Sequence, residues 1–76
     1  MRETILEILT DIRPDVDFEA NKQLIDNGIL ESFDIVTLVS ELSEEFDITI
    51  SPKELVAANF NSVDTLCEMV TRLQGE

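Results

Sequence analysis

The fold is decided by residues 32–46, which read SFDIVTLVSELSEEF. At about 100° of rotation per residue, the apolar side chains of this stretch fall on one arc, and a helix buries such an arc against its neighbours. The arc consists of Ile35, Leu38, Val39, Leu42 and Phe46. Ser32 lies where a helix N-cap belongs, because its hydroxyl can accept a hydrogen bond from a first-turn N–H. We therefore expect an amphipathic helix over residues 32–46, with Asp34 placed against the positive end of its dipole.

A helix is also predicted over residues 2–12. Its apolar stripe contains Met1, Ile5, Ile8, Leu9 and Ile12. Arg13-Pro14 ends it, because the residue before a proline avoids helical backbone angles.

Two further helices are predicted after the central one. The sequence Ser51-Pro52-Lys53-Glu54 indicates a short helix over residues 52–56, in which the serine caps, the proline takes the first position and the glutamate completes a capping box. A last helix is expected over residues 62–74, with Asn61 or Ser62 as its cap. Its inward face contains Val63, Leu66, Met69, Val70 and Leu73.

A long segment without clear periodicity separates the first two helices, as is typical of a functional or self-packed loop. Its apolar anchors would be Phe18, Leu24, Ile25, Ile29 and Leu30. Asn27-Gly28 is compatible with a hairpin turn, but the flanking runs are too short to favour two strands. We predict an all-α fold, a single domain over residues 1–76 that forms a small four-helix bundle with a long first loop and a short third helix.

The composition excludes several classes of function. The 76 residues include 17 Asp and Glu but 5 Lys and Arg, which gives a net charge of -12. Such acidity argues against nucleic acid as a partner, because Lys and Arg make the contacts to phosphates. No run of residues is apolar enough to span a bilayer, so we expect a cytoplasmic protein without direct membrane insertion. We also expect a monomer.

The inventory of reactive side chains argues against an enzyme. The chain has no His and no Tyr, and Cys67 is its single cysteine. Neither a nucleophile–histidine pair nor a zinc cluster can be assembled from this set. The many carboxylates lie on faces that we expect to be exposed, whereas acid–base catalysis needs a buried carboxyl with a shifted pKa.

Charge is concentrated around the central helix. From Gln23 to Pro52 the chain has seven acids and no Lys or Arg. A solvated face is the ordinary explanation, but a mixed surface would serve solubility without self-repulsion, so we favour a surface that steers a basic partner.

Phe33 lies nearly opposite the buried arc of this helix, with Val36 at the margin. It either folds back under the long loop or forms an apolar docking contact rimmed by acids.

The stretch LIDNGILESFDIV, residues 24–36, resembles the phosphopantetheine attachment region of acyl carrier proteins. Its spacing is similar to that of D-alanyl carrier proteins and related stand-alone carriers, with Gly28 four residues before Ser32. The resemblance continues through the predicted third helix and implies a four-helix bundle of acyl-carrier type. Where the family usually has Asp-Ser-Leu, this chain has Glu31, Ser32 and Phe33.

The resemblance also implies a cofactor and partners. A phosphopantetheinyl transferase would attach 4'-phosphopantetheine from coenzyme A to Ser32, and the thiol of this arm would hold an acyl or aminoacyl group as a thioester. A loading ligase or synthase with a basic docking surface would be the second partner. The residues predicted to bind partners are Glu31, Phe33, Asp34, Val36, Thr37, Ser40, Glu41, Glu44, Glu45 and Asp47.

Physical reasoning supports Ser32 independently, because a hydroxyl modified by another enzyme must be exposed, and a helix N-terminus offers N–H groups to a phosphate. The main alternative is an acidic interaction module with no covalent cargo, in which Ser32 is only a cap. A nucleic-acid mimic that occupies a basic groove ranks below both.

Overall fold

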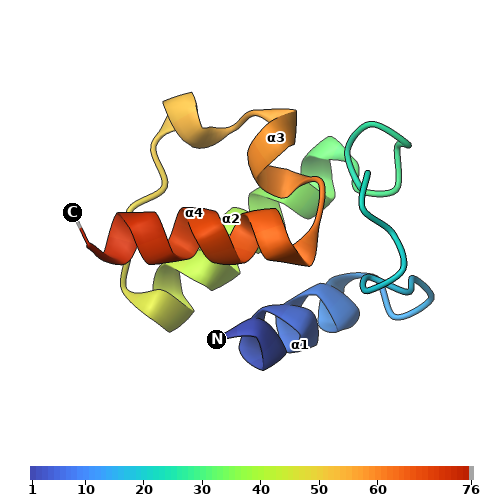
Figure 1. The fold of residues 1–76 in the computed structure, drawn as a ribbon, viewed down its shortest axis with the longest axis horizontal. Helices are drawn as coiled ribbons and strands as arrows, with labels where there is room; N and C mark the ends of the chain where they lie inside the picture. Colours follow the sequence, from blue (N-terminus) through green and yellow to red (C-terminus); the bar gives the residue numbers. More distant parts are fainter. Residues whose placement is uncertain (76) are drawn as a thin grey trace.

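The fold is described for residues 1–75 from a computed structural model (Figure 1). Its elements are α1 (Arg2–Ile12), α2 (Ser32–Phe46), the 3-10 turn η1 (Pro52–Glu54), α3 (Ala57–Phe60) and α4 (Val63–Gln74). No strand occurs within these residues, so the predicted all-α fold is confirmed. No helix in this range is long and apolar enough to cross a membrane.

The two longest helices cross each other, with α4 in front of α2 in Figure 1. Helix α1 packs against both of them, and α3 packs against α4. The core that these helices enclose consists of Ile5, Ile8, Leu9, Phe18, Leu24, Leu30, Leu38, Leu42, Phe60, Val63, Leu66, Met69 and Val70. Every helix therefore depends on its neighbours to cover its apolar stripe.

The predicted inward faces are confirmed with one exception. On α2, Leu38 and Leu42 are fully buried, while the other residues of its arc are half-buried against the core. The exception is Met1, which is 44% exposed because it precedes α1 and lies outside the helical stripe.

The long loop is anchored by buried side chains and closed by a turn, without a hairpin. Phe18, Leu24 and Leu30 are buried. The Leu24 carbonyl accepts hydrogen bonds from the N–H groups of Ile29 (2.9 Å) and Leu30 (3.0 Å). Gly28 adopts a φ of 70°, a backbone conformation that a residue with a Cβ rarely tolerates. The loop therefore reaches α2 through a tight turn centred on Gly28.

The prediction of one short helix over residues 52–56 is wrong. The chain makes a single 3-10 turn at Pro52–Glu54, becomes extended at Val56 and then forms the separate helix α3. Ser51 makes no side-chain cap bond. The reason is that Glu54, which the sequence placed in a capping box, turns into the protein interior.

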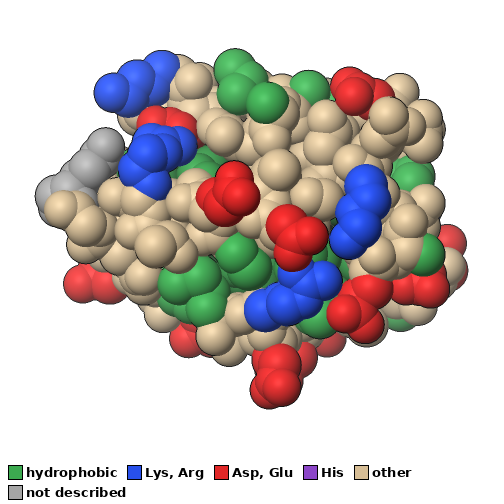
Figure 2. All heavy atoms as spheres, viewed as in Figure 1, with side chains coloured by type: hydrophobic (Ala, Val, Ile, Leu, Met, Phe, Trp, Pro, Cys, Tyr) green, Lys and Arg blue, Asp and Glu red, His purple; other side chains and the backbone are tan. Residues whose placement is uncertain are grey.

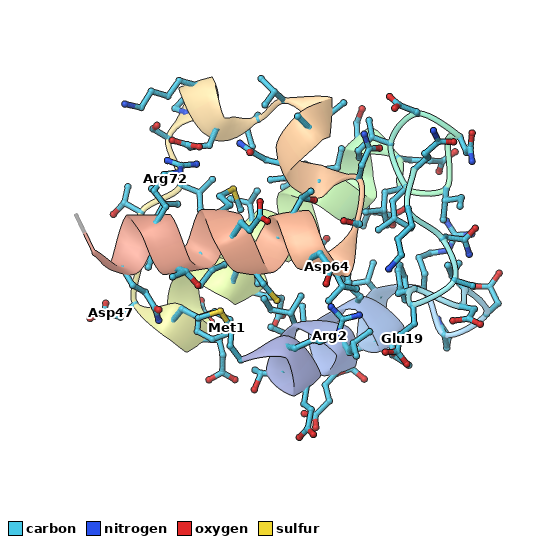
Figure 3. All side chains as sticks on the ribbon, viewed as in Figure 1. Met1, Arg2, Glu19, Asp47, Asp64 and Arg72 are labelled. Carbon is cyan, nitrogen blue, oxygen red and sulfur yellow. The ribbon has the colours of Figure 1, made fainter. Side chains whose placement is uncertain are left out.

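Glu54 is held there by α4. It is 6% exposed, and its carboxylate accepts hydrogen bonds from Arg72 Nη2 (2.6 Å) and Nη1 (3.0 Å). Figure 3 shows Arg72 rising from α4 towards the segment that contains η1. The expectation that the acids lie on exposed faces is therefore wrong for Glu54. Its bonds with Arg72 lower the pKa of the carboxyl, so it stays ionised and structural at neutral pH.

Helix α4 begins as predicted from one of its two candidate caps. Ser62 is the N-cap, and its hydroxyl accepts a hydrogen bond from the Thr65 N–H at 3.1 Å. The other candidate, Asn61, is thereby left to bind elsewhere. On the same helix, burial raises the pKa of the half-buried Cys67 thiol, so this cysteine is mostly protonated at neutral pH.

Candidate functional site

Ser32 is exposed at the N-terminus of α2, but it is not the N-cap. Glu31 takes that position, with extended backbone angles, and its N–H donates a hydrogen bond to Asp34 Oδ2 at 3.1 Å. The predicted cap is corrected by one residue, because Glu31 and Asp34 form a reciprocal capping box that starts the helix at Ser32. The Ser32 hydroxyl makes no hydrogen bond within the part of the chain that the structure describes. It is thus available to an external partner.

Arg13 supports the start of α2 from the side of α1. Its Nη1 donates to the Ile29 carbonyl at 2.9 Å and lies 3.4 Å from Asp34 Oδ2, while its Nε lies 3.5 Å from Asp15. Contact with Asp15, and then with Asp34, raises the pKa of the guanidinium. Sequence reasoning assigned Asp34 to partner binding, and the structure gives its carboxylate two bonds inside the chain. Sequence reasoning did not predict that Arg13 supports the start of α2, because the only indication was a cation at the end of α1.

Asn61 supports the loop ahead of Ser32 from the opposite side. Its Oδ1 accepts hydrogen bonds from the N–H groups of Ile25 (2.9 Å) and Asp26 (3.1 Å). The sequence suggested this residue only as a possible cap of the last helix. A link between residues 35 or more positions apart leaves no periodic trace in a sequence.

Phe33 and Val36 are exposed on α2. Their exposed fractions are 79% and 68%, so the prediction that Phe33 could fold under the long loop is wrong and the docking interpretation remains. Phe33 forms one wall of a hollow of about 250 Å³ between α1 and α2. This hollow is also lined by Asp11, Asp34 and Glu41, so an apolar wall lies beside three carboxylates.

A second apolar patch lies near Ser32. Leu55 and Val56 are about half exposed, and they line a smaller hollow of about 90 Å³ together with Ile35, one turn after Ser32. Sequence reasoning missed both residues because it placed them inside a helix. The two adjacent apolar residues after a turn that begins with proline were the feature of the sequence that indicated an exposed apolar patch.

Cations are paired with acids on the face that carries α4. Arg2 contacts Asp64 and lies 3.6 Å from Glu19, and Lys22 lies 3.6 Å from Asp64. Figure 3 shows Arg2 between these two acids, and Figure 2 shows blue and red side chains interspersed over this face. Charges of both signs are therefore neighbours here.

Helix α2 has a different surface. Ser40, Glu41, Glu44, Glu45 and Asp47 are exposed, and Thr37 is half-buried. Within residues 1–75, none of these acids forms an ion pair. Beyond its first turn, α2 therefore carries the predicted surface of negative charge alone.

Comparisons with known proteins point to one family. Residues 2–70 match the family described as "Phosphopantetheine attachment site". The chain is 32% identical over 78 residues to the D-alanyl carrier protein of Lactobacillus delbrueckii subsp. bulgaricus, covering 100% of this chain and 96% of the relative. It is 29% identical over 76 residues to the D-alanyl carrier protein of Streptococcus mutans, covering 99% and 96%. Aminoacyl carrier protein 1 of Bradyrhizobium diazoefficiens is 44% identical over 59 residues, covering 76% and 64%.

Proposed function

Because the chain belongs to the phosphopantetheine attachment family, whose members are non-catalytic carriers, we propose that Ser32 bears the 4'-phosphopantetheine arm. When bound, the arm supplies a flexible thiol that holds cargo as a thioester. The names of the relatives favour an aminoacyl cargo over other acyl groups.

The observation that carries this proposal is the exposed, unbonded hydroxyl of Ser32 at the first position of α2. A helix of 15 residues presents first-turn N–H groups and a positive dipole end to a phosphate. In the attachment step, the Ser32 oxygen bonds to a phosphorus of coenzyme A, the phosphoanhydride bond breaks and adenosine bisphosphate leaves. The transferase takes the hydroxyl proton, so this chain needs no base of its own.

We further propose that α2 forms the docking surface for partner enzymes. Phe33 and Val36 would be its apolar centre, and its acidic and polar rim would be Glu31, Asp34, Thr37, Ser40, Glu41, Glu44, Glu45 and Asp47. The acids after the first turn of α2, which form no ion pair within residues 1–75, favour partners with basic surfaces, namely a phosphopantetheinyl transferase and a loading ligase or synthase. Since modification uses coenzyme A, we place it in the cytoplasm, with the carrier acting as a monomer.

Mass spectrometry tests the attachment site. Purified protein incubated with coenzyme A and a broad-specificity transferase should gain the mass of one phosphopantetheine. Ser32→Ala should abolish the gain, and Ser43→Ala, which removes another serine of the same helix outside the proposed docking surface, should retain it. A gain that persists in Ser32→Ala would reject the site. No gain with any transferase would favour an acidic interaction module without covalent cargo.

A further inference from the structure

We propose that Asn61, at the junction of α3 and α4, is a positioning residue that holds the turn ahead of Ser32 in the geometry that partner enzymes bind. This inference rests on the proposed function of Ser32. It concerns a residue that touches neither the arm nor the modified oxygen.

Asn61 binds three consecutive residues of the loop. Its backbone carbonyl accepts a hydrogen bond from the Leu24 N–H at 2.8 Å. Its side-chain Oδ1 accepts from the N–H groups of Ile25 (2.9 Å) and Asp26 (3.1 Å), and its Nδ2 donates to Asp26 Oδ2 (3.1 Å). One residue thereby fixes the direction in which the chain enters the turn.

An asparagine suits this position because its amide combines an acceptor and a donor. The oxygen has two lone pairs for two N–H groups, and the nitrogen faces a carboxylate. An aspartate at position 61 would keep the acceptor but would place a second negative charge against Asp26. Exchanging the two side chains would restore one amide facing one carboxylate.

Backbone hydrogen bonds connect Leu24, which Asn61 binds, to the residues just before Ser32. The Leu24 carbonyl receives the N–H of Leu30, which lies two residues before Ser32, and Arg13 holds the Ile29 carbonyl at 2.9 Å. Asn61 therefore secures the entrance of the turn and Arg13 its exit. Between them, a Cβ at Gly28 would meet nothing within 4 Å, so packing does not fix the tip of the turn.

The test compares five proteins with the wild type. Asn61→Ala removes the side-chain hydrogen bonds to the loop, and Asn61→Asp places two carboxylates against each other. Asp26→Asn removes the carboxylate of Asp26 but leaves an amide oxygen that can accept from Asn61. The double variant Asp26→Asn/Asn61→Asp exchanges the two side chains. Asn59→Ala is the matched control, because Asn59 lies two positions away and its amide donates to Glu54 but makes no bond to the turn. All are assayed at a temperature at which circular dichroism shows each protein fully folded.

Two measurements separate positioning from stability. The first is transfer of the phosphopantetheine arm, for which we expect Asn61→Ala and Asn61→Asp to raise KM about tenfold or more with little change in kcat, because binding must then order the turn. The salt dependence of transfer should stay unchanged, since the charges on α2 are untouched. The second is hydrogen exchange of the Ile25 and Asp26 amides, which should become faster in both variants and slow again in the double variant.

The control and the rescue decide the outcome. Asn59→Ala should lower the melting temperature without changing KM, and the exchanged pair should recover most of the wild-type KM. Wild-type KM and exchange rates in Asn61→Ala, or an equal rise of KM in Asn59→Ala, would overturn the inference while leaving Ser32 as the attachment site. Absence of the arm from the wild-type protein would overturn the proposed function as well.

Discussion

Replacing Phe33 by alanine tests whether the exposed face of α2 serves folding or docking. A Phe side chain has roughly 200 Å² of surface, and Phe33 is 79% exposed, so folding covers about 40 Å² of it. At about 25 cal/mol per Å², Phe33→Ala should lower the free energy of unfolding by no more than about 1 kcal/mol. The corresponding loss in melting temperature is below about 8 °C for a domain of this size.

Docking would bury most of the remaining surface. About 160 Å² of Phe33 is left to cover, which sets an upper limit of about 4 kcal/mol on its contribution to partner binding. Aromatic residues at the centre of interfaces commonly lose 2 kcal/mol or more on truncation, a change of about 30-fold. We therefore expect kcat/KM for the transferase or the loading enzyme to fall at least about tenfold in Phe33→Ala.

Phe60→Ala is the matched comparison, because it removes the same ring from the core, where Phe60 is 2% exposed. It should cost about 3–5 kcal/mol of stability. Urea unfolding of both variants and transferase kinetics of Phe33→Ala complete the assay. If Phe33→Ala instead destabilises the fold as much as Phe60→Ala and leaves kinetics unchanged, the assignment of Phe33 to docking is refuted.

Three further predictions follow from burial and charge. Leu42 is fully buried, so Leu42→Ala should cost about 2–5 kcal/mol in urea unfolding while sparing the exposed surface of α2. Arg72 lowers the pKa of Glu54 below its ordinary value of 4.5, so the ion pair stabilises the fold above that pH, and its contribution is lost as pH falls through the lowered value. Glu54→Gln should therefore be less stable than the wild type near neutral pH, with a difference that shrinks in acid; an equal difference at both pH values would contradict the assignment. Added salt should raise the melting temperature by screening the net charge of -12 and slow association with the transferase; faster association would contradict steering by α2.

The sequence was sufficient for features that repeat with the helical period. Leu38 and Leu42 are buried where the wheel of α2 places them, and Phe33 is exposed on the opposite side. Periodicity reports burial because neighbouring helices cover the same stripe at every turn. The same reasoning placed Ser32 at the start of α2, although the N-cap is Glu31, one residue earlier.

Contacts between distant segments were beyond the reach of that reasoning. Ser51 to Glu54 reads as a capping box, and local chemistry alone would form one. Arg72, 18 residues later, offers the carboxylate of Glu54 a bidentate bond and draws it inward instead. The bonds of Asn61 to the loop were not predicted for the same reason, since its partners lie more than 30 residues earlier in the chain.

The distribution of cations explains how so acidic a chain can fold and still steer a partner. The ion pairs of Arg2, Lys22 and Arg72 lie on the side of α4, where they relieve repulsion between packed segments. Arg13 forms an ion pair with Asp34 in the first turn of α2, where it supports the approach to Ser32. The acids after that turn form no ion pair within residues 1–75. Because exposed pairs contribute little stability each, their location matters more than their number: it leaves unpaired acids along the helix that begins with Ser32, the residue that a basic enzyme must reach.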